Sequence, residues 1–244
     1  MQTPLASSGL AHVWVQGDAV TRTVALVLLG MSLATWIILL WKALDQRTQR
    51  RQARACEHFW HSADFAEGLE KLGNEPGNPF RALAIDGREA TRHILHKDSQ
   101  THPQLHDHLD LSDWVERALR NSVDDFTARA QSGLTVLASV ASTAPFVGLF
   151  GTVWGIYHAL LGIATAGQVS IDQVAGPIGE ALIMTALGLL VAIPAVLGYN
   201  ALVRGNKGIA HRLNRFANDL LTYFVTGARV TVDSEEKAMP MQKA

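Results

Sequence analysis

One acidic side chain in a long apolar stretch is the residue with the most evident chemistry. Glu180 lies between Ala130 and Val203, where Asp172 is the only other charged residue. A carboxylate at the centre of a membrane costs on the order of 2.5–3.5 kcal/mol, so such a residue usually faces a bundle interior, a partner or an ion path. Burial and a nearby water column act on a carboxyl in opposite directions, so a balanced group can take up and release protons. Glu180 is thus a candidate proton relay, and an uncharged or interfacial acid near the outer surface is the alternative.

Small residues at helical spacing surround this acid on two apolar segments. In lipid, helices associate through close backbone approach at such positions. We therefore predict helix-packing roles for Gly148, Gly151, Gly155 and Gly188. Thr152 lies within the first stripe, where its hydroxyl either bonds back to its own helix or lines a polar path. Thr185, in the second stripe, is about 140° around the helix from Glu180, so only several copies of the chain could bring both to one cavity.

Three apolar blocks are long enough to cross a membrane, for which roughly 20 residues suffice. They predict spans at 23–41, 130–165 and 177–203. A cleaved signal peptide is the competing reading of the first block. Its basic residues follow the apolar run instead of preceding it, and Trp36 and Trp41 lie near that end like interfacial anchors, which favours a retained helix.

Clusters of basic residues predict the orientation, because Lys and Arg beside a span tend to stay in the cytoplasm. One cluster follows the first span, and Arg204, Lys207, Arg212 and Arg215 follow the third. The segments 1–22 and 166–176 are then periplasmic, and 42–129 and 204–244 are cytoplasmic. The second cluster is also a candidate site for anionic lipid. Control of orientation alone explains it equally well.

The cytoplasmic segment reads as helices. Arg47–Leu72 continues the first span, and Gly73–Pro79 breaks it. Apolar stripes at helical spacing then begin at Phe80 and, after an N-cap at Asp110, at Trp114. The second stripe enters the second span without a stop signal, which predicts one long helix; its apolar positions are Trp114, Val115, Ala118, Leu119, Val123 and Phe126. Pro177 is a plausible start for the third span, and Val230–Ala244 is expected to be disordered at its end.

The expected fold is therefore an all-α membrane protein. It has three transmembrane helices, of which the second and third extend into the cytoplasm, and a helical cytoplasmic domain. Cys56 is the only cysteine, which excludes an internal disulfide and a multi-cysteine zinc site within one chain. The composition gives no sign of nucleic-acid binding. A histidine-based metal or enzymatic module is a third possibility, although several of its members flank Pro103 in a predicted loop; they are His93, His96, His102, His106 and His108.

Two segments resemble a known family. Ser142–Ile156 (STAPFVGLFGTVWGI) and Gly176–Asn200 (GPIGEALIMTALGLLVAIPAVLGYN) are similar to the ExbB/TolQ/MotA proton-channel subunits, and to the ExbB branch more than to the TolQ branch. The resemblance is strong over Ala130–Asn200. It implies a Gram-negative inner-membrane subunit that forms a pentameric ring around a dimer of an ExbD-like single-span partner, whose transmembrane Asp binds the proton. It also implies that the motor energises TonB-dependent transport without a metal or other cofactor.

In this family the membrane glutamate and two threonines line the proton route, which the resemblance carries to Glu180, Thr152 and Thr185. His158 departs from the family's ion-path residues, and an interfacial role is the expectation for it. A TolQ-type subunit, or a passive scaffold that stabilises partner proteins, remains the alternative function. Sodium remains an alternative ion, since a carboxylate with threonines suits either.

Overall fold

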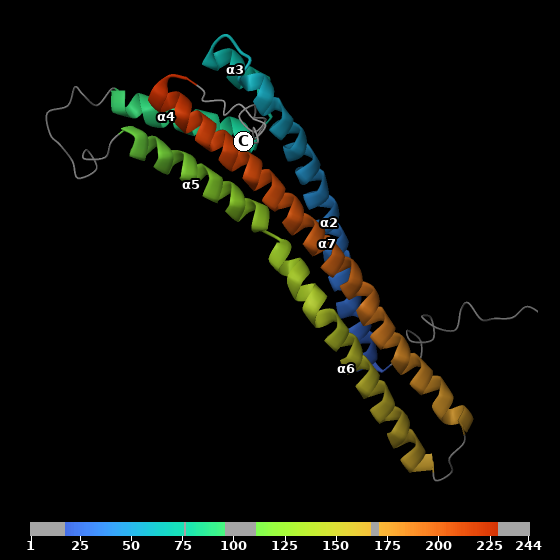
Figure 1. The fold of residues 1–244 in the computed structure, drawn as a ribbon. Coiled ribbons are helices and arrows are strands. Elements are labelled where there is room, and N and C mark those ends of the chain that lie inside the picture. The colour runs from blue at the N-terminus through green and yellow to red at the C-terminus, as the bar shows by residue number, and fades with distance from the viewer. Residues whose placement is uncertain (1–17, 76, 96–110, 167–170, 229–244) are drawn as a thin grey trace, which may run out of the picture. The chain divides into compact units, whose positions relative to one another are not determined.

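All elements that the structure describes are helices. The computed structural model describes residues 18–75, 77–95, 111–166 and 171–228. The helices in order are α2 (Ala19–Phe59), α3 (Phe65–Lys71), α4 (Pro79–Leu95), α5 (Leu111–Gln131), α6 (Leu134–Ala166) and α7 (Ile171–Thr226) (Figure 1). They form two compact units: unit 1 comprises residues 1–46 and 131–205, and unit 2 comprises residues 47–130 and 206–244.

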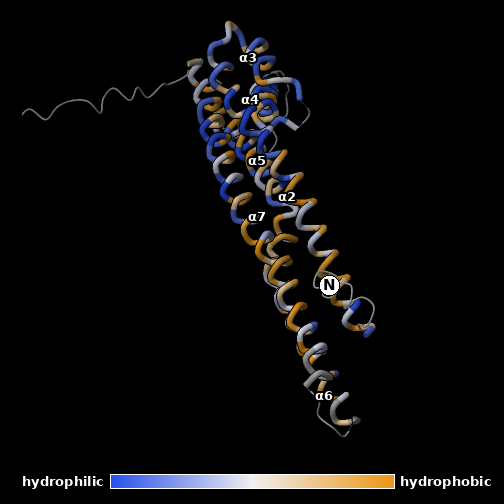
Figure 2. The backbone as a smooth tube through the Cα atoms, turned by 90° about the vertical axis from the view of Figure 1, so that its right-hand side faces the viewer, coloured by the Kyte–Doolittle hydropathy of each residue, from blue (hydrophilic) through white to orange (hydrophobic). Residues whose placement is uncertain are grey.

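Three helical stretches are long and apolar enough to cross a membrane: Ala19–Phe59, Leu111–Gly162 and Gly176–Thr226. The prediction of an all-helical chain with three such helices is confirmed for the described residues. In unit 1 the tubes of α2, α6 and α7 are coloured mainly as apolar, as Figure 2 shows. The stretch around α2 buries 17% of its most apolar window and the other two bury 33%, so most of this apolar surface faces outward from a single chain.

The helix predicted to run unbroken into the second span is interrupted. α5 ends at Gln131 and α6 begins at Leu134, with Gly133 between them at φ +80°. A left-handed residue cannot continue the helical hydrogen-bond ladder, and glycine adopts it without a steric penalty. Next to this interruption, the carbonyl oxygen of Ala130 accepts from Nδ2 of Asn206 at 2.9 Å.

The predicted helix from Arg47 to Leu72 is also divided. α2 ends at Phe59, and α3 begins after the N-cap Asp64, whose side chain accepts from the backbone N–H of Glu67 at 2.7 Å. The Glu67 carboxylate in turn accepts from the N–H of Ala63 at 2.8 Å. A Cβ on Gly68 would lie 2.8 Å from Phe59 Cδ2, so the chain turns back closely on itself here.

The predicted break at Gly73–Pro79 is confirmed, because no helix lies between Lys71 and Pro79 among the described residues. Gly73 and Gly77 have φ of 89° and 86°. Asn78 is buried; its Nδ2 donates to the carbonyl of Leu72 at 2.6 Å and its Oδ1 accepts from the N–H of Phe80 at 3.0 Å. This side chain joins the end of one helix to the start of the next.

The helix that holds the third apolar stretch begins before Pro177. α7 starts at Ile171 and contains both Pro177 and Pro194, so Pro177 is not the helix start that the sequence suggested. A proline removes one backbone donor and crowds the preceding turn, so it marks a possible helix start without requiring one. The apolar stretch itself begins at Gly176, and the bounds 177–203 for the span stay a prediction. Asp110 and Val230–Ala244 lie outside the described residues.

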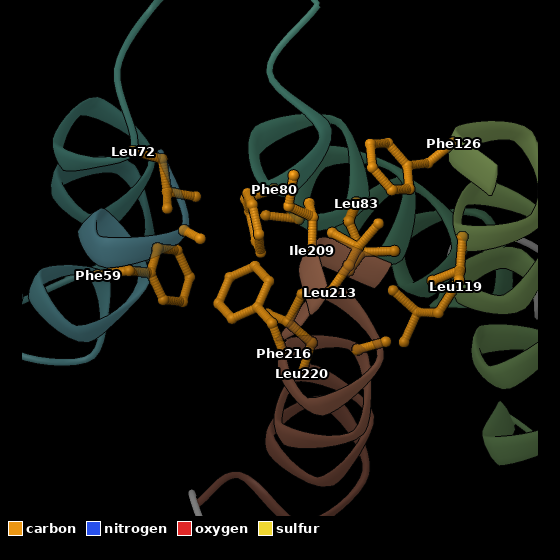
Figure 3. Close-up of a cluster of buried hydrophobic side chains, with 14 of the residues drawn as sticks. Phe59, Leu72, Phe80, Leu83, Leu119, Phe126, Ile209, Leu213, Phe216 and Leu220 are labelled. Atoms are coloured by element: carbon orange, nitrogen blue, oxygen red, sulfur yellow. The ribbon is translucent and has the colours of Figure 1, made fainter. Parts of the chain in front are cut away.

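Unit 2 has an aromatic core (Figure 3). Phe216 of α7 is 3% exposed and contacts the rings of Phe59 and Phe80 at centroid distances of 5.3 and 6.0 Å. The predicted stripes of α4 and α5 supply the opposite side, and their buried members are Phe80, Leu83, Ala84, Val115, Leu119, Val123 and Phe126. The periodic apolar positions therefore form one core, as an amphipathic pattern predicts.

Candidate functional site

The closest approach of α6 and α7 within unit 1 is made by glycines. A Cβ on Gly148 would lie 2.6 Å from the carbonyl oxygen of Met184, and one on Gly188 would lie 2.7 Å from the carbonyl oxygen of Ala144. These two α-carbons thus lie directly against the facing backbone. A larger side chain at either position would separate the helices, because backbone atoms cannot move aside independently.

Two further glycines continue this contact along α6. A Cβ on Gly155 would lie 2.9 Å from Cβ of Ala181. At Gly151 a Cβ would meet both Met184 Cβ at 3.0 Å and Val24 Cγ1 at 3.1 Å, so α2 also packs at this level. All four glycines singled out from the sequence therefore lie at contacts between helices of unit 1.

Thr152 lies inside this contact and is 8% exposed. Its Oγ1 is 3.2 Å from the carbonyl oxygen of Gly148 on its own helix and 3.0 Å from that of Ala181 on α7. It also contacts Oγ1 of half-buried Thr185. The back-bonded geometry that the sequence offered as one alternative is present, together with a contact across to α7; a role in a polar path stays a prediction.

A single hydroxyl hydrogen serves these three neighbours. Thr152 can donate to only one oxygen at a time, while its own oxygen can accept from Thr185. The pair therefore has more acceptors than hydrogens, and rotation about Cβ–Oγ exchanges its partners without moving either helix. Such a group can pass a hydrogen bond on to an arriving ion or water.

Glu180 is half-buried and directly precedes Ala181, whose carbonyl oxygen accepts from Thr152. The structure thus brings the two threonines into contact. Glu180 lies on α7, five residues before Thr185. Sequence reasoning missed the contact between Thr152 and Thr185, because it treated each helix separately. One signal for it was available: each threonine lies four residues after a small residue on its own helix, Gly148 or Ala181.

His158 lies one and a half turns beyond Thr152 on α6 and is exposed. Its ring is 4.6 Å from that of Trp154, and its Nε2 is 3.9 Å from Oδ2 of Asp18 at the start of α2. Its contacts are with Trp154, Tyr157 and Asp18, away from the threonine pair.

The four basic residues proposed for lipid, Arg204, Lys207, Arg212 and Arg215, are all exposed. Among the residues described, no group of three or more His, Cys, Asp or Glu side chains could hold a metal ion. His96, His102, His106, His108 and the side chain of His93 fall outside the described part of the chain, so the histidine module stays a hypothesis.

Comparison with known proteins gives the family. Residues 87–215, more than half of the chain, match the model of the MotA/TolQ/ExbB proton channel family. The chain is 40% identical over 237 residues to the biopolymer transport protein ExbB of Xanthomonas campestris pv. campestris, covering 93% of this chain and 92% of that protein. It is also 40% identical over 212 residues to ExbB of Neisseria meningitidis, covering 86% and 94%.

A second branch matches more weakly. The Tol-Pal system protein TolQ of Pseudomonas aeruginosa is 32% identical over 203 residues, covering 82% of this chain and 85% of that protein. Both branches thus align over most of their own length as well as most of this chain. With three helices able to cross a membrane, glycine-mediated packing and a paired-threonine site, the chain belongs to the MotA/TolQ/ExbB proton channel family.

Proposed function

We propose that the chain is a subunit of an inner-membrane motor that is driven by the proton-motive force and energises TonB-dependent outer-membrane transport. Identity to proteins named ExbB exceeds identity to proteins named TolQ, 40% against 32%, and supports this branch. The observation that carries the mechanism is the contact of the hydroxyls of Thr152 and Thr185, with Thr152 also reaching the carbonyl oxygen of Ala181, the residue after Glu180, in a stretch almost without charge.

In this proposal Glu180, Thr152 and Thr185 line the proton route. The carboxyl exchanges protons and the two hydroxyls relay hydrogen bonds beside it. One charge that crosses 100 mV releases about 2.3 kcal/mol, so a few protons per step suffice to shift a partner helix between two states. Protons are the expected coupling ion, and no metal or other cofactor is required.

The chain is proposed to act only with partners. The large outward-facing apolar surface of unit 1 suits a ring of copies, a pentamer, around an ExbD-like single-span protein whose membrane Asp binds the proton. A TonB-like protein would receive the work. The N-terminus would lie in the periplasm and the C-terminus in the cytoplasm, where exposed Arg204, Lys207, Arg212 and Arg215 would contact anionic lipid headgroups.

The test replaces side chains on the proposed route in a Gram-negative host that lacks its own ExbB. Glu180→Gln and Thr152→Val should each reduce energised siderophore uptake at least tenfold, because they remove the exchangeable proton or the hydroxyl. Thr152→Ser keeps the hydroxyl and should retain most uptake. Gly179→Ala is the control, since a Cβ there meets nothing within 4 Å.

Co-purification with the single-span partner separates transport from assembly. Normal uptake in Glu180→Gln would overturn the proton-route proposal. Loss of uptake only in proportion to lost complex would instead favour a passive scaffold. The TolQ match supports a second candidate, a Tol-Pal subunit. Restoration of outer-membrane integrity in a host lacking TolQ, without restoration of siderophore uptake, would identify it.

A further inference from the structure

The start of α2 is tied to α6 through one carboxylate. Asp18 precedes the first residue of α2, and its Oδ1 accepts from the backbone N–H of Ala19 at 2.6 Å. Its other oxygen, Oδ2, accepts from Nε1 of Trp154 at 3.3 Å and lies 3.9 Å from Nε2 of His158. We call Asp18, Trp154 and His158 the outer clasp. It joins residues far apart in sequence but within unit 1.

The contacts of His158 fix how its ring can bond. Its Nδ1 lies 3.3 Å from the carbonyl oxygen of Trp154, and a carbonyl only accepts, so Nδ1 carries a hydrogen in this contact. The ring is held between Trp154 and Tyr157, at 4.6 and 5.5 Å. Nε2 then faces the Asp18 carboxylate, and it can donate to it only when the imidazole is doubly protonated.

The outer clasp and the proposed proton route both involve the segment of α6 around residues 151–158. Val24, two turns into α2 and 5% exposed, packs at Gly151, where an added Cβ would lie 3.1 Å from Val24 Cγ1. Gly151 is adjacent to Thr152, and Trp154 follows two residues later. The packing contact between α2 and α6 therefore lies next to the site where Thr152 contacts α7.

We propose that Asp18 is a positioning residue whose hold on α6 strengthens at acid pH through His158. Trp154 contributes its N–H at every pH, whereas His158 contributes a charged donor to Asp18 only when its imidazole is doubly protonated. Acidification on the side of the membrane where the clasp lies would thus tighten α2 on α6. The consequence for ion passage rests on the proposed function, but the clasp itself does not.

Other titratable groups lie near the outer clasp, and one of them provides the control variant. On α2 the next turn carries exposed Arg22, and on α6 Tyr157 contacts the His158 ring. On α7 the titratable residue Glu180 precedes Ala181, which packs against Gly155. Arg22→Gln changes the local charge without removing a member of the clasp, so it is the matched control.

The experiment measures hydrogen exchange of the full chain in lipid nanodiscs at pH 5.5 and pH 8. The readout is the protection factor of the amides of residues 22–27, compared with wild type at the same pH. His158→Gln should lower protection about two- to fivefold at pH 5.5, the range expected for an exposed ion pair, and leave it unchanged at pH 8. Asp18→Asn should lower protection at both pH values.

The double variant decides whether the two residues act together. At pH 5.5, Asp18→Asn with His158→Gln should expose these amides no more than Asp18→Asn alone, and Asp18→Glu should restore part of the protection. Additive effects of the two substitutions, or an equal effect of His158→Gln at both pH values, would overturn the proposal. Neither outcome depends on uptake, so a failure here is distinct from a failure of the proton-route proposal.

Discussion

The helices within unit 1 and the helices within unit 2 pack in opposite ways. Unit 2 is built on large side chains: Phe216 packs edge-on against Phe59, with their rings 5.3 Å apart, and Leu213 and Leu220 are fully buried beside it. In unit 1 the closest helix contact has no side chains at all, since Gly148 and Gly188 lie against facing backbone. Large apolar side chains such as Phe146 and Leu197, at 69% and 65% exposed, point outward there.

The difference reflects the solvent that each unit is suited to. In water, burial of apolar area stabilises by roughly 25 cal/mol per Å², so aromatic side chains belong inside. In lipid this gain is absent, and helices are stabilised by close packing and hydrogen bonds between them. Unit 1 accordingly has Gly148, Gly188 and Thr152 at its helix contacts, while many of its large apolar side chains face outward.

The largest effect is expected for loss of an aromatic ring from unit 2. Phe216→Ala should destabilise this unit by about 3–5 kcal/mol, because a cavity opens between Phe59 and Phe80. Hydrogen exchange of the amides of α4, measured with the chain in lipid, reports this as faster local opening. Exchange of α6 should change little. Equal loss of protection in both units would show that they are not distinct.

An effect of similar size is expected for the rate at which Cys56 of unit 2 is alkylated. Burial raises the pKa of this thiol to about 12 from 9.0, against a smaller opposing effect of Arg212. At a pH below both pKa values, the thiolate fraction of Cys56 is about a thousandfold smaller than that of a thiol with the ordinary pKa. Alkylation, which requires the thiolate, slows by the same factor. Labelling with iodoacetamide at pH 8 should be slow in the native chain and fast after denaturation, and it should rise about tenfold per pH unit. Rapid native labelling would contradict the burial of this side of unit 2.

A smaller loss is expected for a methyl group added to unit 1. Gly188→Ala puts a Cβ 2.7 Å from the Ala144 carbonyl oxygen, and overpacking of this kind costs about 1–3 kcal/mol. Gly30→Ala on α2 meets nothing within 4 Å and should gain up to about 1 kcal/mol from helix propensity. The thermal midpoints of the two variants in detergent should therefore move in opposite directions, and a shared direction would argue against backbone contact at Gly188.

The sequence predicted those features that repeat along one helix. The stripes beginning at Phe80 and Trp114 supply the core of unit 2, and the break at Gly73–Pro79 follows from residues that favour turns. Features that depend on a second element were missed. The turn before Asp64 relies on the approach of Gly68 to Phe59, and the side chain of Asn206 on α7 donates to the Ala130 carbonyl beside the Gly133 interruption.

The candidate site shows the same limit. Glu180, Thr152 and the glycines were singled out because a charge, a hydroxyl and small residues are unusual in apolar helices. The pairing of Thr152 with Thr185 depends on the register of α6 against α7, which the periodicity of either helix leaves open. The clasp at His158 depends similarly on Asp18, which lies far away in sequence.

The carbonyl that Thr152 reaches on α7 belongs to Ala181, four residues before Thr185. That is the oxygen to which a threonine at 185 would ordinarily turn within its own helix. The same carbonyl oxygen is therefore an acceptor for either hydroxyl, and the orientation of one hydroxyl changes which oxygens its neighbour can bond. A change on one helix can in this way reach the neighbouring helix through rotation of a hydroxyl group, while the distance between the helices stays the same.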